Sequence, residues 1–212
     1  MSPIACDVVA RIYTRKGDDG TTGLLFGGRV PKSSPAIEAN GAVDEAQAVM
    51  GLARAEAGRA SELDPLLVAL ERDLWVLMAE VATAPGNRSK LVAGTTLVTS
   101  SMVDALEGHI DRVTERAALP TEFVVPGENR VSALLDVART VVRRAERLVA
   151  GAPPSPDSLA GPYLNRLSDL LWALARWQES EYLTARDPAL GSPRDATRRP
   201  AYDPTTIDEE HR

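Results

Sequence analysis

The stretch Phe123-Val-Val-Pro-Gly-Glu-Asn-Arg-Val-Ser-Ala-Leu-Leu-Asp-Val-Ala-Arg-Thr-Val-Val-Arg-Arg-Ala-Glu-Arg147 decides the fold of this chain. Pro126-Gly127 is a turn-forming pair, and Asn129 can cap a helix that begins directly after it. Apolar residues then recur at helical spacing in one stripe with a second set beside it. The stripe is Leu134, Val137, Val141, Ala145 and Leu148, and the neighbouring set is Leu135, Ala138 and Val142. Because most of the circumference is apolar, the pattern predicts a buried helix.

A line of charged residues follows the same predicted helix at Asp136, Arg139, Arg143 and Glu146. Charges on a buried helix need partners or a ligand. Two arginines one turn apart, with a carboxylate beyond them, suit a polyanion such as a triphosphate. A ladder of ion pairs, Asp136–Arg139 or Arg143–Glu146, explains the same spacing. The helix by itself leaves both explanations open.

The composition restricts the class of protein. The chain has 212 residues, of which 44% are hydrophobic and 25% charged, enough for one domain with a substantial core. Its net charge of −6 argues against a general nucleic-acid-binding surface. The single cysteine, Cys6, permits no internal disulfide, which fits a reducing, cytoplasmic setting. We also expect no membrane span, no signal peptide and, with two histidines and no Glu-x-x-His pair, no di-iron centre.

A second notable segment is Arg15-Lys-Gly-Asp-Asp-Gly-Thr-Thr-Gly23, near the start of the chain. Its three glycines allow backbone N–H groups to approach a phosphate closely, and its cations and hydroxyls favour the same ligand. An ordinary β-turn explains Asp-Asp-Gly equally simply. The segment is not a Walker loop, because Gly-x-x-x-x-Gly-Lys-[Ser/Thr] is absent. Lys32 is a further cation on this glycine-rich arm.

The remaining periodic segments predict an all-α fold, a five-helix antiparallel bundle behind the arm. We expect Asp64 to cap the second helix with Pro65 in its first position, Trp75 to lie in the core or an interface, and His109 to be structural. The expected helices cover about 37–57, 64–82, 101–119, 129–150 and 162–177. The expected organisation is a flexible leader over 1–10, a helical domain over 11–180 and a polar, disordered tail over 181–212.

Four separated groups of residues together resemble one family. They are Thr14-Arg-Lys-Gly-Asp-Asp-Gly-Thr-Thr22, Val43-Asp-Glu-Ala46, Phe123-Val-Val-Pro-Gly127 with Ala138-Arg-Thr-Val-Val-Arg-Arg-Ala-Glu-Arg147, and Tyr163-Leu-Asn-Arg-Leu-Ser-Asp169. In this order and spacing they resemble the PduO-type ATP:cob(I)alamin adenosyltransferases, over roughly residues 11–176. The resemblance favours the anion-site explanation of the charged line.

The resemblance implies an activity and a site. The enzymes of this family transfer the 5′-deoxyadenosyl group of ATP to reduced cobalt, release triphosphate, and are usually homotrimers with active sites between subunits. Phe123 is then expected under the corrin, and Asp44 is expected to pair with Arg139 across the interface, with Arg143 beside them in the catalytic group. The expected ATP-binding residues are Thr14, Arg15, Lys16, Gly17, Thr22, Gly23, Lys32, Arg143, Arg144, Glu146, Arg147 and Asn165. Mg²⁺ is expected on the triphosphate rather than on a site of protein ligands, and a flavoprotein reductase and a B12-dependent mutase are the expected partners.

The chain departs from the family pattern at three places. Asp136 stands where the family commonly has His, Asn40 replaces its usual Tyr, and Ala46-Gln47 replaces Leu-Asn. These departures motivate an alternative hypothesis, a non-catalytic protein that binds ATP or adenosylcobalamin as a chaperone or sensor. A purely structural bundle is the third hypothesis. The triphosphate residues and Phe123 are retained, which favours the enzyme.

Overall fold

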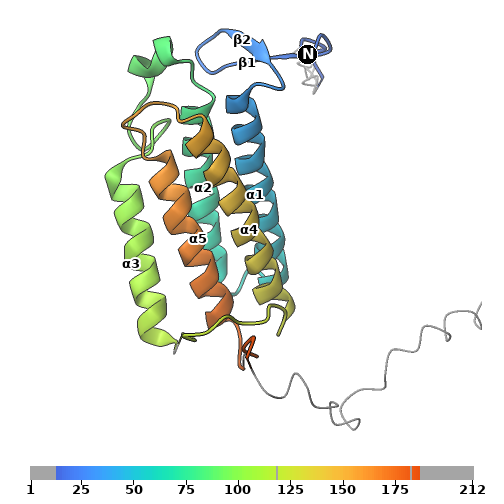
Figure 1. Ribbon diagram of the computed structural model, residues 1–212, viewed down its shortest axis with the longest axis vertical. Coiled ribbons are helices and arrows are strands. Elements are labelled where there is room, and N and C mark those ends of the chain that lie inside the picture. Colours follow the sequence, from blue (N-terminus) through green and yellow to red (C-terminus); the bar gives the residue numbers. More distant parts are fainter. Residues whose placement is uncertain (1–12, 118, 182, 187–212) are drawn as a thin grey trace, which may run out of the picture.

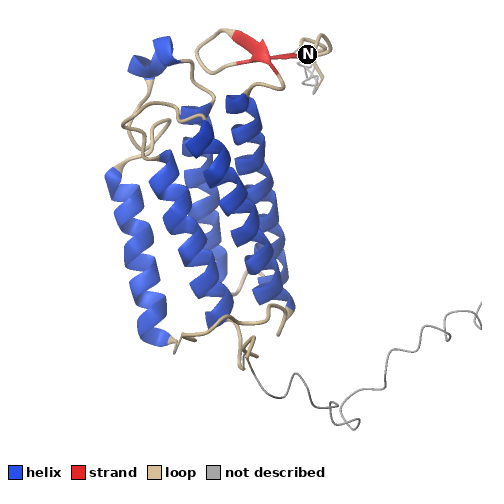
Figure 2. Ribbon diagram, viewed as in Figure 1, coloured by secondary structure: helices blue, strands red, loops and turns tan. Residues whose placement is uncertain are grey.

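The structure is a computed structural model that describes residues 13–117, 119–181 and 183–186. Five long helices form a bundle, as predicted, and a small β-hairpin lies across one end of it (Figures 1 and 2). The helices are α1 (Pro35–Ala57), α2 (Leu63–Val81), α3 (Ser100–Arg116), α4 (Arg130–Gly151) and α5 (Ala160–Trp177). The hairpin pairs β1 (Thr21–Gly23) with β2 (Arg29–Pro31), and a 3₁₀ helix, η1 (Pro85–Lys90), follows α2.

The helices pack in a fixed order of neighbours. α1 packs against α2 and α4, α4 packs against α5, and α5 packs against α3. Figure 1 shows that α1, α3 and α5 begin at the end of the bundle that carries the hairpin, whereas α2 and α4 begin at the opposite end. The α1/α2, α1/α4 and α4/α5 pairs are therefore antiparallel, and α3 runs parallel to α5. The loop over 119–129, which contains Phe123 and precedes α4 (the Phe123 loop), lies at the end of the bundle away from the hairpin.

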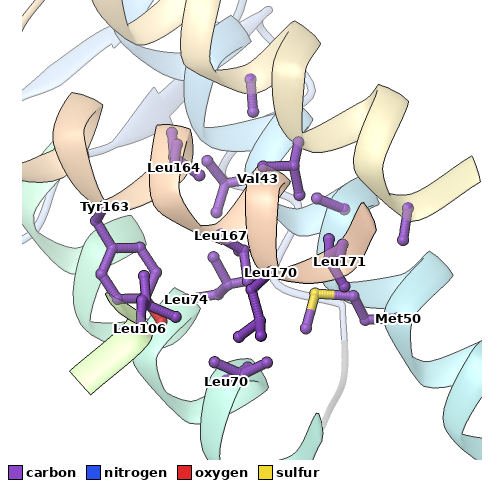
Figure 3. Packing of buried hydrophobic residues seen from close by; sticks show 14 of the residues in the cluster. Val43, Met50, Leu70, Leu74, Leu106, Tyr163, Leu164, Leu167, Leu170 and Leu171 are labelled. Atoms are coloured by element: carbon purple, nitrogen blue, oxygen red, sulfur yellow. The ribbon is translucent and has the colours of Figure 1, made fainter. Parts of the chain in front are cut away.

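The core is centred on α5, which is buried on most of its circumference. Figure 3 shows Leu167 and Leu170 of α5 packed among side chains of α1 and α2. Tyr163 is fully buried beside Leu106 of α3, and its hydroxyl donates a hydrogen bond to Asp73 Oδ2 at 3.0 Å. This bond gives the phenol the polar partner that a buried tyrosine requires.

The helix at 130–151 is buried on one side only, which differs from the prediction. Its buried apolar residues are the neighbouring set of the sequence pattern, Val149, and one member of the stripe taken as central, Ala145. The other members of that stripe are only partly covered, and Val137 is 49% exposed. Since adjacent residues on a helix differ by about 100° in direction, two neighbouring stripes cannot both face one core.

Other details also differ from the prediction. The α2 N-cap is Glu62, and Asp64 lies in the first turn, where its carboxylate accepts a hydrogen bond from Arg54 Nε at 2.8 Å. Trp75 is 66% exposed, so it does not lie in the core, and the alternative expectation of an interface stays a prediction. α3 ends at Arg116, three residues before the predicted end, and the hairpin was not predicted. The predicted leader over 1–10, Cys6 included, lies outside the described residues, as does most of the predicted tail.

Candidate active site

A cavity of about 280 Å³ opens between the Phe123 loop, α4 and α5. The loop is followed by a capping box: Asn129 Oδ1 accepts from the Ser132 backbone N–H at 2.9 Å, and Ser132 Oγ accepts from the Asn129 N–H at 3.3 Å. This cap fixes where α4 begins and therefore which α4 side chains face α5. The cavity is lined by Phe123, Val124, Pro126, Asp136, Arg139, Arg143, Ser168, Asp169, Trp172 and Arg176.

A buried ion-pair network forms the floor of this cavity. Asp136 Oδ2 lies 2.6 Å from a terminal nitrogen of Arg176, and Asp136 Oδ1 lies 3.3 Å from Arg139 Nε. Arg176 also holds both carboxylate oxygens of Glu179, at 2.7 and 2.9 Å. Burial disfavours the charged form of Arg176, but the hydrogen bonds to Glu179 and Asp136 outweigh it and raise the pKa of Arg176. The guanidinium carbon lies 5.9 Å from the centre of the Trp172 ring, which adds a cation–π contact.

The ion-pair explanation of the charged line on α4 is realised in part. Asp136 and Arg139 form an ion pair within the helix, as the ladder explanation predicts. Arg143 and Glu146 do not: Glu146 Oε1 instead accepts a hydrogen bond from Asn165 Nδ2 at 2.9 Å. Within the described part of the chain, Arg143 has no ion-pair partner, although its side chain borders the cavity. It is therefore the cation of the cavity that is available to an anionic ligand.

The predicted nucleotide residues on α4 and α5 lie close together, on the turns of α4 that follow Arg143. Asn165 joins Glu146 on one side and accepts from Arg166 at 2.7 Å on the other. Arg144 pairs with Glu45 of α1, and Arg147 is exposed. Asn165 and Glu146, both expected at the ATP site, are therefore hydrogen-bonded to each other.

The glycine-rich arm, over residues 13–34, consists of a turn followed by the hairpin of β1 and β2. The Gly20 N–H donates to the Gly17 carbonyl at 3.2 Å, and the Asp19 carboxylate accepts from the Thr21 N–H and hydroxyl at 2.9 and 2.8 Å. These two bonds, with Arg29 nearby, lower the pKa of Asp19. The turn explanation is thus confirmed, and it gives Asp19 and Arg29 structural roles that the sequence did not reveal.

Lys32 of the arm lies beside Gly17. A Cβ atom added at Gly17 would meet Lys32 Nζ and the Thr21 carbonyl oxygen, both at 3.2 Å, so the lysine lies directly over the glycine. Arg15 has a left-handed backbone (φ 60°) and lies 5.6 Å from the ring centre of Tyr13. The other predicted arm residues are exposed or half-buried at its surface: Thr14, Lys16, Thr22 and Gly23. A ligand can reach all of these residues.

The arm is attached to α2 rather than to α4. The Leu25 N–H donates to the Ala82 carbonyl at 2.9 Å, and Asn87 Nδ2 of η1 donates to the Phe26 carbonyl at 3.4 Å. Among residues 13–117, 119–181 and 183–186, no hydrogen bond or ion pair joins the arm to α4. Asp44 is exposed on α1, and Arg139 is occupied by Asp136 of the same chain. One chain therefore does not bring the predicted arm and α4 residues into contact.

Sequence reasoning found Phe123 but missed the α5 residues of the cavity and the other loop residues, Val124 and Pro126. Arg176, Trp172 and Ser168 line it, and Glu179 closes its ion-pair network. One signal was available: Asp169 and Arg176 are seven residues apart on a helix and so share a face.

No helix among the described residues is long and apolar enough to cross a membrane.

The fold and the cavity define a helical-bundle protein with a cationic pocket beside an exposed aromatic ring. Comparison with known proteins agrees, because residues 12–178 match the family model described as cobalamin adenosyltransferase. This chain belongs to the cobalamin adenosyltransferase family.

Individual relatives are similar over nearly their whole length. A corrinoid adenosyltransferase of Citrobacter freundii is 40% identical over 172 residues, covering 80% of this chain and 96% of the relative. One from Mycobacterium tuberculosis (strain H37Rv) is 40% identical over 172 residues, covering 79% and 88%. Among solved structures, a variant PduO-type ATP:corrinoid adenosyltransferase from Lactobacillus reuteri, complexed with cobalamin and ATP, has a TM-score of 0.74 at 26% identity and covers 84% of this chain and 100% of that chain.

Proposed function

We propose that this chain transfers the 5′-deoxyadenosyl group of ATP to the cobalt of cob(I)alamin, forming adenosylcobalamin and releasing triphosphate. The observation that carries the proposal is the cavity in which Phe123 stands beside Arg139 and Arg143. An exposed aromatic ring suits the flat face of a corrin, and an arginine without an ion-pair partner among the described residues suits a polyphosphate. The named relatives are corrinoid adenosyltransferases, which supports this assignment.

The reaction requires little covalent chemistry from the protein. The electron pair of cobalt(I) attacks the 5′ carbon of ATP, a cobalt–carbon bond forms, and the carbon–oxygen bond to the triphosphate breaks. The triphosphate leaves with the electron pair of the broken carbon–oxygen bond, and cobalt is formally oxidised to cobalt(III). The protein needs neither a nucleophile nor a general base, and its contribution is to hold the two substrates in line.

The arginines and lysines stabilise the leaving group. Negative charge develops on the triphosphate as the carbon–oxygen bond breaks, and fixed cations favour this charge more than they favour bound ATP. We assign this role to Arg143, with Lys16 and Lys32 of the arm around Gly17. Glu146 and Asn165 hold each other at 2.9 Å and are assigned to the nucleoside end of ATP.

Phe123 is assigned to the lower face of the corrin. Its side chain is 88% exposed, so it is available to contact a ligand. An apolar ring at that face excludes an axial ligand from cobalt. Without that ligand, four-coordinate cobalt(II) is easier to reduce to the cobalt(I) nucleophile.

We further propose that the active site is completed between subunits of a homotrimer. Within one chain the arm contacts α2 and η1, whereas Arg143 lies on α4. The half-exposed stripe on α4 that includes Val137 gives an apolar surface for a neighbouring copy. Asp44, exposed on α1, is then the partner for Arg139 of the adjacent subunit, in addition to Asp136.

Magnesium, the redox partner and the location belong to the same proposal. The described residues contain no group of three His, Cys, Asp or Glu side chains that could hold a metal ion. We propose that magnesium arrives with the triphosphate, where it would neutralise phosphate charge. Reduction of cobalt(II) requires an electron donor, for which a flavoprotein reductase is suitable, and a B12-dependent mutase would use the product. A cytoplasmic location stays a prediction from the single cysteine.

The test is a direct assay under anaerobic conditions. The protein is mixed with ATP, magnesium and chemically reduced cobalamin, and formation of the cobalt–carbon bond is followed by absorbance. We expect adenosylcobalamin in catalytic amounts. Binding of ATP or adenosylcobalamin without turnover would instead support the chaperone or sensor hypothesis, and binding of neither would reject both.

A further inference from the structure

We propose that residues 183–185, which follow α5, form a strap that positions Phe123 for the adenosyl transfer, a role that rests on the proposed function. The Val125 N–H donates to the Leu183 carbonyl at 2.8 Å, and the Ala185 N–H donates to the Phe123 carbonyl at 2.7 Å. Val124 and Thr184 are opposite each other in this antiparallel bridge. The strap lies beyond residue 178, where the match to the family model ends.

The strap continues a longer contact between the two chain segments. Asn129 Nδ2 donates to the Gln178 carbonyl at 2.7 Å, and Ser180 Oγ donates to Glu128 Oε1 at 2.9 Å. With the two backbone hydrogen bonds, contacts between the segments extend from the N-cap of α4 to Phe123. The direction of the loop is therefore set from the C-terminal side of α5.

Phe123 depends on this backbone support because its own side chain is not packed. The ring is 88% exposed, so the rest of the chain contributes little to hold it. Its carbonyl, however, accepts the hydrogen bond from Ala185, and the N–H group two residues later donates to Leu183. An aromatic ring that must exclude an axial ligand from cobalt has to be fixed within a fraction of an ångström. The strap supplies that constraint without touching the substrate itself.

Ala185→Pro tests the strap because proline has no N–H group to donate to Phe123. Thr184→Pro is the matched control. In a bridge of this kind the N–H of the opposed residue, Thr184, points away from the partner strand. Val125→Pro removes the hydrogen bond from the Val125 N–H to the Leu183 carbonyl. This variant replaces Ala185→Pro in the test if Ala185→Pro does not fold.

Two measurements distinguish a loss of Phe123 positioning from a loss of overall stability in the Ala185→Pro variant. We expect Ala185→Pro to lower kcat about tenfold, the effect of losing roughly one hydrogen bond, with the KM for ATP little changed. We also expect a smaller fraction of four-coordinate cobalt(II) corrinoid in the ATP complex, measured by electron paramagnetic resonance. Thr184→Pro should match the wild type in both.

The outcomes distinguish the strap from the proposed function. If the wild-type chain forms no adenosylcobalamin, the proposed function fails, and the strap proposal with it. If the wild type is active and a folded Ala185→Pro or Val125→Pro variant has the same kcat and the same four-coordinate fraction, only the strap proposal is overturned. A rise in the KM for ATP alone would also overturn it.

Discussion

Asp136 is the residue on which the charges of the candidate site converge. It is 5% exposed and holds Arg176 with one oxygen and Arg139 with the other. Its position on α4 determines how Arg139 is presented to the cavity. The family commonly has His there, and a carboxylate allows this chain to balance the buried arginine of α5.

Replacing Asp136 by Asn should destabilise the protein. The variant leaves a buried arginine with one fewer anionic partner, and breaking such a pair costs about 3 kcal/mol. We expect the free energy of unfolding in urea to fall by about that amount. Asp169→Asn is the control, because Asp169 lines the same cavity but is exposed. Equal stability of Asp136→Asn and the wild type would contradict the network.

A half-buried carboxyl, Asp73, should make stability depend on pH. Burial raises its pKa above the ordinary value of 3.8, although the hydrogen bond from Tyr163 and the nearby His109 oppose the shift. A raised folded-state pKa means that the stabilising contribution is complete below the unfolded-state pKa. That contribution is then lost as the pH rises through the folded-state pKa.

Asp73→Asn removes the half-buried charge and keeps an oxygen to accept from Tyr163. We expect this variant to be more stable than the wild type at about pH 7, with the difference disappearing near about pH 3. Urea unfolding at the two pH values measures it, with the exposed Asp111→Asn on α3 as the control. A difference that is the same at both pH values would show that charge is not its cause.

At the scale of elements, the arm is a separate unit that presents cations at one end of the bundle. Gly17 permits Lys32 to lie directly over the turn. Gly17→Ala forces the lysine or the Thr21 backbone to move, because the new methyl group would lie 3.2 Å from both. We expect the KM for ATP to rise about tenfold and kcat to fall as well, because Lys32 is assigned to the charge that develops on the triphosphate.

Gly86→Ala is the control for this experiment, since a Cβ atom there meets nothing within 4 Å. Steady-state kinetics with varied ATP give both constants. An unchanged KM in Gly17→Ala would remove the arm from the ATP site.

The elements show what sequence periodicity can determine. The cap at Asn129 and the five helical segments follow from local chemistry, because capping and apolar spacing act within a few residues. The inward face of α4 did not follow, since two adjacent apolar stripes fit the period equally well. The Asp136–Arg176 pair joins residues 40 positions apart, and only the packing of α4 on α5 brings them together.

The whole molecule is organised so that one chain holds two separate halves of the candidate site. The arm lies at one end of the bundle and the Phe123 loop at the other (Figure 1). Association of copies offers a way to place an arm beside the cavity of a neighbour. The resemblance to a family predicted this arrangement, whereas the periodic pattern of a single sequence contains no information about it.

Asp44→Asn should weaken assembly and activity together. If Asp44 pairs with Arg139 of a neighbouring subunit, its loss leaves Arg139 with Asp136 as its remaining anionic partner, and breaking a buried pair costs about 3 kcal/mol. We expect a smaller species by analytical ultracentrifugation at low protein concentration, and reduced turnover. Glu45→Gln is the control, because Glu45 is the adjacent residue and pairs with Arg144 in the same chain. An unchanged trimer with normal turnover would reject this role for Asp44.

The measurement that tests the central claim most directly is the ratio of the two products. Wild-type protein is mixed with ATP, magnesium and chemically reduced cobalamin, and adenosylcobalamin and triphosphate are quantified in the same sample. The proposed reaction breaks one carbon–oxygen bond for each cobalt–carbon bond formed, so the two should appear in equal amounts. Release of ADP and phosphate in place of triphosphate, or ligand binding with no cobalt–carbon bond, would contradict it.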